Sequence, residues 1–245
     1  MQIKDAVVLV TGANRGLGKS LVQAFLAAGA RKVYAGSRKL VESSDPRLQP
    51  IKLDITNAHD IAAAAETCQD INILINNAGI ATFTTFLTAP SLDEARNTME
   101  TNYIGTLAMI RAFAPILKKN GGGVLVNMLS VLSWFASPRL GSYSASKAAA
   151  LALTETIRIE LRSQGTLVMG VHAGFMDTDM ADQAIGPKVS TGVVAASIIE
   201  GISSDREEVL ADQPSQNVKA MLASNRQAFY KQIQADWDGA QQAAV

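Results

Sequence analysis

Short runs of aliphatic and β-branched residues alternate with longer segments of helical periodicity along this chain. The apolar runs predict strands over residues 6–11, 32–36, 50–53, 71–75, 123–128, 167–171 and 208–211. Helix-length segments between them include residues 17–28, 61–69, 91–118 and 142–162. Strands separated by helices predict right-handed βαβ crossovers, and therefore a parallel sheet with helices on both faces.

Neither a linker-like stretch nor an internal repeat interrupts this alternation. We therefore expect a single α/β domain over residues 1–245, built on a doubly wound, Rossmann-like sheet of seven parallel strands. After the last strand, residues 214–237 predict an amphipathic helix with a frayed tail beyond Gly239. The apolar side of this helix can pack on the domain or on another subunit, and the pattern does not decide between the two.

The composition excludes several classes of protein. Apolar residues make up 48% of the chain, and 22 basic residues balance 22 acidic ones. This balance argues against nucleic acid as a partner, because binding to phosphates requires an excess of basic charge.

Cys68 is the only cysteine, which excludes an intrachain disulfide and favours a cytoplasmic protein. Because no stretch approaches the ~18 uninterrupted apolar residues of a membrane span, we expect a soluble protein without a membrane partner. We expect no metal site.

The first predicted strand runs directly into a glycine-rich loop, Thr-Gly-Ala-Asn-Arg-Gly-Leu-Gly at residues 11–18. Glycine lets the backbone turn tightly and approach a pyrophosphate without a Cβ clash. The helix that follows presents free N–H groups and the positive end of its dipole to that pyrophosphate. The alternative is a glycine-rich turn without a ligand, but the position between a strand and a helix favours a dinucleotide site. The predicted cofactor contacts of this loop are Gly12, Asn14, Arg15, Gly16, Leu17 and Gly18.

The end of the second predicted strand carries no acidic residue. NAD sites commonly place an acid there for the ribose 2′-hydroxyl, whereas an arginine accommodates the 2′-phosphate of NADP. Here the strand leads into Ser37 and Arg38, and Arg15 projects from the neighbouring glycine loop. Two guanidinium groups can hold a dianionic phosphate through forked hydrogen bonds. The alternative is a pair of solvated surface arginines, but their joint placement predicts NADP(H) as the cofactor.

Tyr143 and Lys147 stand four residues apart at the start of a long predicted helix, so both side chains lie on one helical face. A free tyrosine has a pKa near ~10, and a nearby cation lowers this pKa towards the range of a general acid or base. Ser130 follows the fifth predicted strand, and the sequence Asn-Asn-Ala-Gly at residues 76–79 closes the fourth. Both positions lie at the carboxyl edge, where open α/β sheets bind ligands.

Together these features resemble the short-chain dehydrogenase/reductase family, and the resemblance covers nearly the whole chain. The matching features are the loop at residues 11–18, Asp54, the segment at residues 76–79, Asn102, Ser130, Tyr143 and Lys147. Ser130 precedes Tyr143 by thirteen residues, the usual separation in that family. The resemblance implies an oxidoreductase that transfers a hydride between NADP(H) and a carbonyl or secondary alcohol, with the protein supplying the proton and the orientation.

The resemblance also implies a role for each site residue. Tyr143 would protonate the carbonyl oxygen or deprotonate the alcohol, and Ser130 would hydrogen-bond that oxygen. Lys147 would bind the nicotinamide ribose and lower the pKa of Tyr143, while Asn102 would anchor a water that links Lys147 to solvent. The remaining cofactor contacts that it implies are Asp54, Ile55, Asn77, Ala78, Gly79, Gly174 and Thr178.

Several of these residues have alternatives. Ser133 and Ser144 compete with Ser130 for the role of the catalytic serine, and the spacing and the strand-edge position favour Ser130. For His172, a position that does no chemistry in this family, a structural role is expected. The asparagines with a purely structural alternative are Asn76, Asn77 and Asn102.

The chain departs from the family pattern in two regions. Ala173 replaces the proline that usually precedes Gly174, which should loosen this turn slightly. Leu129 stands where a small hydroxyl residue is frequent. The predicted helix at residues 214–237 takes the place of the glycine-rich tail that packs in many tetramers. We expect a homo-oligomer; a dimer through the fourth and fifth helices is the commonest contact in the family, and a tetramer stays open.

The substrate loop is expected around residues 179–190, with Trp134, Phe135 and Leu140 nearby. These apolar side chains suggest a hydrophobic ketone, aldehyde or secondary alcohol, unless Trp134 and Phe135 are ordinary core residues. Steroids, acyl-carrier thioesters, quinones, sugars and aryl ketones all stay open as substrates.

Two functions of other classes compete with an enzyme. An NADP-sensing binding protein on the same fold should have lost part of the Ser, Tyr and Lys set, which this chain retains in full. An interaction module acting through the C-terminal helix should show an unusually apolar stripe, whereas Gln, Lys and Asp crowd that segment. Both observations favour the enzyme.

Overall fold

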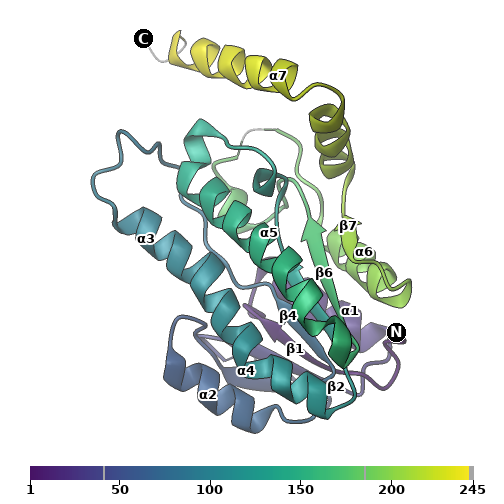
Figure 1. Cartoon of the computed structure of the whole chain (residues 1–245). Coiled ribbons are helices and arrows are strands. Elements are labelled where there is room, and N and C mark those ends of the chain that lie inside the picture. Colours follow the sequence, from purple (N-terminus) through teal and green to yellow (C-terminus); the bar gives the residue numbers. More distant parts are fainter. Residues whose placement is uncertain (41, 185, 243–245) are drawn as a thin grey trace.

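The computed structural model describes residues 1–40, 42–184 and 186–242. Its strands form one parallel sheet in the order β3-β2-β1-β4-β5-β6-β7, which confirms the predicted doubly wound fold. The strands are β1 (Val7–Thr11), β2 (Lys32–Ser37), β3 (Leu48–Lys52), β4 (Ile73–Asn76), β5 (Gly123–Met128), β6 (Thr166–His172) and β7 (Glu208–Leu210). The α-helices are α1 (Gly16–Ala27), α2 (Ala58–Thr67), α3 (Asp93–Met99), α4 (Thr106–Lys119), α5 (Gly141–Leu161), α6 (Thr191–Ser203) and α7 (Gln213–Gln242). Figure 1 shows how helices cover both faces of the sheet.

Each face of the sheet has its own apolar core, because alternate residues of a strand point to opposite faces. On one face, Val8 and Val10 of β1 pack with Phe25 of α1 and Ile198 of α6. On the other face, Leu9 packs in a core to which α2, α4 and α5 contribute. Residues 7–10 are all fully buried, so the strand is apolar at every position. In β1, polar side chains are therefore confined to its end, at Thr11.

The observed strands start or end within two residues of the predicted positions. The largest shifts are at β3, which begins at Leu48 instead of residue 50, and at β4, which begins at Ile73 instead of residue 71. Pro50 lies inside β3, where it is tolerated because β3 is an edge strand that pairs only with β2.

The helix expected over residues 91–118 is present but is not uniformly α-helical. It consists of α3, a π-helical segment η1 (Glu100–Gly105), and α4. Asn102 lies in the middle of this segment and is buried. Short π-helical segments within α-helices are frequent at functional sites, because the extra residue redirects side chains locally.

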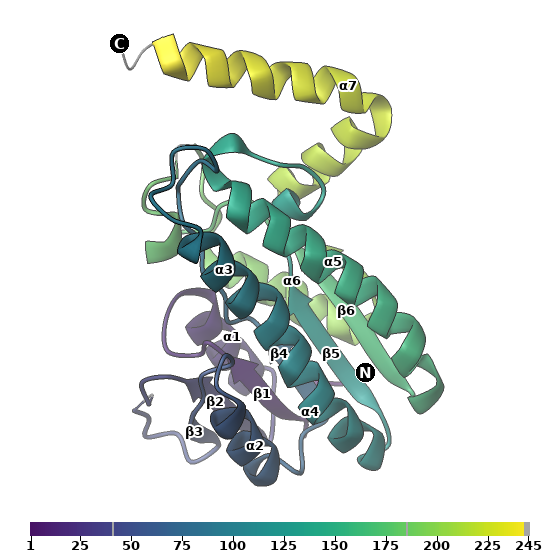
Figure 2. The same ribbon diagram turned by 60° about the vertical axis from the view of Figure 1, so that its left-hand side comes forward.

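The C-terminal helix α7 is longer than predicted and is interrupted. It continues to Gln242, past the tail predicted to fray beyond Gly239. Asn225 has non-helical angles of φ −156° and ψ 84°, and its Oδ1 accepts a hydrogen bond from the Ala228 N–H at 2.9 Å. This bond caps the second half of α7. Figures 1 and 2 show that second half turned away from the body of the protein, so the single expected helix is two helical segments.

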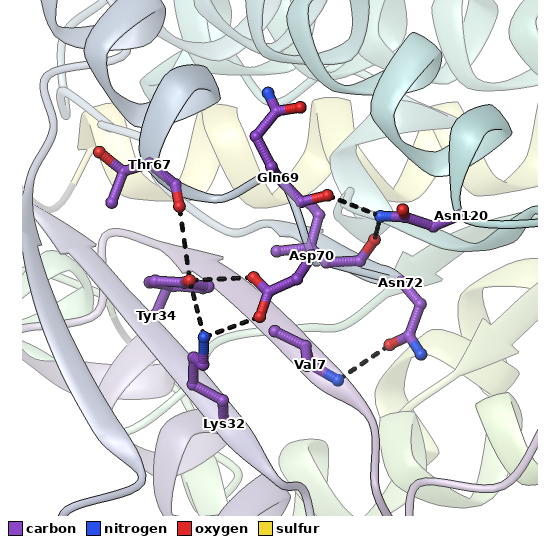
Figure 3. Close-up of polar contacts among 9 residues, drawn as sticks. Val7, Lys32, Tyr34, Thr67, Gln69, Asp70, Asn72 and Asn120 are labelled. Carbon is purple, nitrogen blue, oxygen red and sulfur yellow. Dashed lines mark hydrogen bonds and ion pairs between the residues drawn. The ribbon is translucent and has the colours of Figure 1, made fainter.

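A polar cluster closes the amino edge of the sheet (Figure 3). Asp70, which precedes β4, accepts hydrogen bonds from Lys32 Nζ at 2.7 Å and from the Tyr34 hydroxyl at 2.9 Å. Asn72 Oδ1 accepts one from the Val7 N–H at 3.0 Å. Partial burial acts to raise the pKa of Asp70, but the donors Lys32 and Tyr34 and the Lys32 charge lower it below its ordinary value. The cluster ties β1, β2 and β4 together at the edge opposite to the predicted ligand site.

We expect Asp70→Asn to lower the free energy of unfolding by about 1 kcal/mol near neutral pH. The folded pKa of Asp70 is below the unfolded value of ~3.9, so its contribution is present above that value and is lost as the pH falls through the folded pKa. Urea unfolding of both proteins at about pH 7 and about pH 3 measures this. A difference that is as large at the lower pH would contradict the assignment. Asp93→Asn, which removes an exposed pair with Arg96, is the control and should change little at either pH.

Candidate active site

A cavity of about 780 Å³ opens at the carboxyl edge of the sheet. The loops that follow the strands on either side of β1 converge on it, as the fold predicts. The predicted site residues on its wall are Gly12, Asn14, Arg15, Gly16, Leu17, Gly18, Ser37, Arg38, Asp54, Ile55, Asn77, Ala78, Gly79, Tyr143, Lys147 and Thr178. Three predicted site residues, Asn102, Ser130 and Gly174, are not on this wall.

The glycine loop lies tightly against the segment that follows β4. The Thr11 hydroxyl accepts hydrogen bonds from the Asn77 and Ala78 N–H groups, both at 3.0 Å, and Asn77 Nδ2 donates to the Thr11 carbonyl at 2.9 Å. A Cβ on Gly18 would lie 2.1 Å from the Gly12 carbonyl oxygen. Gly12 itself has φ +67°, a conformation that favours glycine. The loop therefore leaves the start of α1 facing the cavity, where its free N–H groups can bind an anion.

Arg15 and Arg38 form a basic end of the cavity. Arg15 Nη1 makes an ion pair with Asp179 Oδ2 at 2.7 Å, and both side chains are largely exposed. Such a surface pair contributes ~0–1 kcal/mol, so Arg15 can still turn to a phosphate. The Thr56 N–H lowers the pKa of the Asp54 carboxyl through a hydrogen bond, and the charge of Arg38 adds to this effect. Arg38 and Asp54 thus lie close together at this end of the cavity.

Tyr143 and Lys147 reach the cavity from the first turns of α5, as predicted. Lys147 Nζ donates to the Met128 carbonyl at 2.6 Å and lies 5.6 Å from the centre of the Tyr143 ring. Burial raises the pKa of Tyr143 to about 12, against the opposite effect of the Ser130 hydroxyl. Burial also lowers the pKa of Lys147 to about 8. The expected lowering of the Tyr143 pKa by Lys147 is not seen, because burial dominates and the ammonium is bound to a backbone carbonyl. Tyr143 is therefore protonated at neutral pH.

Ser130 follows β5 directly and is buried behind the cavity wall. Its Oγ accepts a hydrogen bond from the Leu132 N–H at 3.2 Å, so its own proton is free to be donated elsewhere. Its N–H donates to Ser133 Oγ at 3.1 Å, which gives Ser133 a structural role. Ser144 Oγ donates to the Leu140 carbonyl at 2.9 Å within α5 and its preceding turn. Of the three serines considered, Ser130 is the one that acts on Tyr143.

Asn102 connects three parts of the site. Its Oδ1 accepts a hydrogen bond from the Ile80 N–H, and its Nδ2 donates to the Ile80 carbonyl and to Ser146 Oγ, all at 2.9 Å. These bonds join the π-helical segment to the chain after β4 and to α5, next to Lys147. Because the amide is already bonded within the protein, the structure shows a positioning role; the water relay implied for Asn102 stays a prediction.

The turn after β6 is held by a residue that the sequence analysis did not identify. The Gly174 N–H donates to Asp212 Oδ2 at 2.8 Å, and Asp212 Oδ1 accepts from the Ser215 N–H at 2.8 Å. Asp212 thus caps α7 and fixes the turn in which Ala173 stands in place of proline. The spacing of Asp212 and Ser215 just before a helix is a capping signal that could have revealed it. Gly174 packs against Pro214, away from the cavity wall.

The apolar residues expected near the substrate are not on the wall of this cavity. Trp134 stacks on His172 with ring centres 3.9 Å apart, and Phe135 packs edge-on against Phe229 of α7 at 4.9 Å. Leu140 is buried. The apolar residues on the cavity wall include Ile80, Met128, Leu129, Met176 and Met180. Of the expected substrate loop at 179–190, residue 185 lies outside the described residues.

Within residues 1–40, 42–184 and 186–242, no group of three or more His, Cys, Asp or Glu side chains could hold a metal ion. None of the helices described there has the length and apolar character needed to cross a membrane.

Comparison with known proteins agrees with this geometry. A family profile described as short chain dehydrogenase matches residues 6–187. The chain belongs to the short chain dehydrogenase family. Among curated relatives, a dehydrogenase/reductase SDR family protein 7-like from Drosophila melanogaster is 31% identical over 84% of this chain and 68% of its own length. A 3-oxoacyl-[acyl-carrier-protein] reductase from Synechocystis is 31% identical over 72% of this chain and 76% of its own length. This chain spans 68%, 45% and 66% of the lengths of the first three relatives.

Solved structures of the family show the same fold. A short chain dehydrogenase from Burkholderia cenocepacia in complex with NADP is 43% identical, with a TM-score of 0.91 over 95% of this chain and 99% of that one. A family member from Burkholderia phymatum in complex with NAD is 23% identical, with a TM-score of 0.79 over 91% of this chain and 92% of that one, and shows the fold alone.

Gly18→Ala should abolish binding of the dinucleotide, because the new Cβ would lie 2.1 Å from the Gly12 carbonyl oxygen and force the loop away from the segment after β4. Fluorescence titration with NADPH measures the Kd, which we expect to rise by at least about 100-fold. Gly239→Ala is a matched control, since nothing lies within 4 Å of a Cβ at that position. Binding by the Gly18 variant as tight as by the control would contradict the packing argument.

Proposed function

We propose that this protein is an NADP(H)-dependent oxidoreductase that interconverts carbonyl compounds and secondary alcohols. The observation that carries the proposal is the placement of Tyr143 and Lys147 on the wall of the same cavity as the glycine loop and Arg38. A dinucleotide site and a buried proton donor in one cavity are the two parts that hydride transfer requires. Because the chain is shorter than its first relatives, their activities are carried over only as part of this proposal.

The residues of the cavity fit NADP(H). Gly12 and Gly18 let the loop pack tightly, because a Cβ on Gly12 would meet Ala78 and a Cβ on Gly18 would meet the Gly12 carbonyl oxygen. This packing leaves the start of α1 facing the cavity, where it can bind a pyrophosphate. Arg15 and Arg38 supply cationic groups for a 2′-phosphate, and the similar structure from Burkholderia cenocepacia is a complex with NADP. The bound nicotinamide would supply or accept the hydride.

The proton would come from Tyr143. Burial keeps its hydroxyl protonated at neutral pH, which suits it to act as an acid in carbonyl reduction. Ser130 Oγ accepts from the Leu132 N–H, so its own proton can bind the substrate oxygen and hold it beside Tyr143. Lys147 lies next to Tyr143 and, as an ammonium, would favour the phenolate that remains after proton transfer.

We propose a hydrophobic ketone, aldehyde or secondary alcohol as the substrate. The support is the lining of the cavity by Ile80, Leu129, Met176 and Met180, instead of the Trp134 and Phe135 side chains first expected there. Methionine adapts to irregular apolar ligands, so this lining favours a range of related compounds. The Synechocystis relative is named a 3-oxoacyl-[acyl-carrier-protein] reductase, which keeps acyl-carrier thioesters with a ketone group among the candidate substrates.

We further propose a cytoplasmic homodimer that associates through α4 and α5. Ile159 of α5 is 79% exposed and Ile104, just before α4, is 41% exposed. Exposed apolar residues on the two helices named for the contact are consistent with an interface. Cys68 is fully buried, as expected for an unreactive thiol in a reducing compartment.

A binding protein without catalysis is the alternative on the same fold. The complete Ser130, Tyr143 and Lys147 set, with Tyr143 protonated, favours the enzyme. A panel of carbonyl compounds and alcohols with both NADPH and NADH distinguishes the two, since the binding protein would bind NADPH and turn over none of them.

Tyr143→Phe should reduce kcat with any active carbonyl by at least about 1000-fold, because the group proposed to protonate the substrate oxygen is removed. NADPH oxidation followed by absorbance measures the rate, and fluorescence titration confirms that the cofactor still binds. Tyr230→Phe, a change on the partly exposed face of α7, is the control and should leave kcat unchanged. Full activity of the Tyr143 variant would overturn the mechanism.

Arg38→Ala should raise the KM for NADPH by about 10-fold or more and leave the KM for NADH nearly unchanged, because only NADPH carries the 2′-phosphate. Initial rates at varied cofactor with a fixed carbonyl measure both constants. Arg31→Ala, at the opposite end of β2 from the cavity, is the matched control. Equal effects on the two cofactors would remove the argument for NADP(H).

A further inference from the structure

His172 lies directly behind the serine of the active site and is 1% exposed. It ends β6, and its Nδ1 is 3.1 Å from the carbonyl oxygen of Ser130. A carbonyl oxygen can only accept a hydrogen bond, so Nδ1 must carry the proton. The contact therefore identifies the tautomer of His172 as well as its partner.

The imidazole ring is held in place by its other neighbours. Trp134 stacks on one face, with ring centres 3.9 Å apart and an angle of 20° between the planes. The Glu208 carboxylate lies 3.7 Å from Nε2, too far for a strong hydrogen bond, and it forms an ion pair with Lys219 of α7. Lys219 also lies over the Trp134 ring at 5.6 Å from its centre. The ring is thus held between the turn from Ser130 to Trp134 and Glu208 of β7, which Lys219 of α7 braces from behind.

The groups around Ser130 explain what the His172 bond adds. The Ser130 carbonyl also accepts the Ser133 N–H at 3.0 Å, but that donor belongs to the same short turn and moves with it. The next N–H, of Val131, donates to the Ala173 carbonyl at 3.1 Å. His172 is the one side chain in the described structure that connects the Ser130 carbonyl to another element. Together with the Val131 N–H bond on the same peptide group, it fixes the orientation of the group whose rotation would move Ser130 Oγ.

We propose that His172 is a positioning residue that sets the orientation of Ser130 for the substrate oxygen through the Nδ1–H···O=C bond. This inference rests on the proposed function for its kinetic consequence, but not for the bond itself. It gives His172 a part in the reaction that acts through Ser130, without any contact with substrate or cofactor.

Charged groups near His172 do not disturb this arrangement. Burial lowers the pKa of His172 to about 4; the Ser130 bond and Glu208 act to raise it, and Lys219 and Lys147 act to lower it further. The ring therefore stays neutral, with its single proton on Nδ1, throughout the pH range in which the enzyme would work.

The first test reads the tautomer and needs no substrate. The chain has 2 histidines, so a long-range ¹H–¹⁵N spectrum contains two imidazole systems, and His172→Asn assigns them. We expect His172 to show the Nδ1–H tautomer, without titration between about pH 5 and pH 8. A spectrum of the Nε2–H tautomer would overturn the proposal, whether or not the protein proves to be an enzyme.

The second test compares two amides at the same position. The Asn amide nitrogen is as many bonds from Cα as Nδ1, whereas the Gln amide nitrogen matches Nε2. We expect His172→Asn to keep kcat within about 3-fold of the wild type and His172→Gln to lose about 10-fold or more, with the Kd for NADPH unchanged in both. Equal losses in the two variants would mean that His172 only fills space.

A double-mutant cycle separates positioning from general damage. If His172 acts through Ser130, the loss of kcat caused by His172→Gln should disappear in a Ser130→Ala background. A loss that multiplies with that of Ser130→Ala would overturn the proposal. If the wild type turns over no compound of the panel, the proposed function fails, and the tautomer measurement still decides whether the bond exists.

Discussion

Burial of the parallel sheet on both faces is the constraint on which the rest of this protein depends. With residues 7–10 fully buried, β1 can carry no polar side chain along its length, and polar groups are confined to its ends. At the amino edge they bond to one another, as Lys32, Tyr34 and Asp70 do. At the carboxyl edge the loops diverge around a cavity, and their polar groups face it. The same constraint therefore produces a closed edge and a functional edge.

Burial also sets the protonation states at the functional edge. It raises the pKa of Tyr143, lowers that of Lys147 and lowers that of His172. In each case the neutral form is favoured, because the low-dielectric interior disfavours charge. The result is a phenol that can donate a proton, an ammonium whose charge is easily lost, and an imidazole with a single, defined proton. Burial is thus the largest cause of the pKa shift in all three groups.

The sequence predicts most of the fold and of the site, because both depend on local patterns. The period of the apolar runs predicts the strands, and Gly18 and Tyr143 stand at positions that their neighbours in sequence define. Other features depend on contacts between distant residues and leave no local pattern. Trp134 was expected near the substrate, yet it stacks on His172, which lies far along the chain. The π-helical turn at Asn102 requires Ile80 and Ser146 as partners. Burial raises the pKa of Tyr143, although Lys147 lies only four residues away. The spacing of the two residues in the sequence does not reveal how deeply Tyr143 is buried.

Because α7 is broken at Asn225, the segment beyond it can unfold locally at a lower free-energy cost than the strands of the sheet. The strands share both cores and open only when the whole protein unfolds. Beyond Asn225, Phe229 of α7 packs on Phe135 of the body, and most side chains of this segment face solvent. Local propensity alone supports a helix of this size only weakly. Its amide protons should therefore exchange with solvent through frequent local opening, at rates independent of the strands. Motion at this end of the chain can thus proceed without disturbing the sheet that orients the active site.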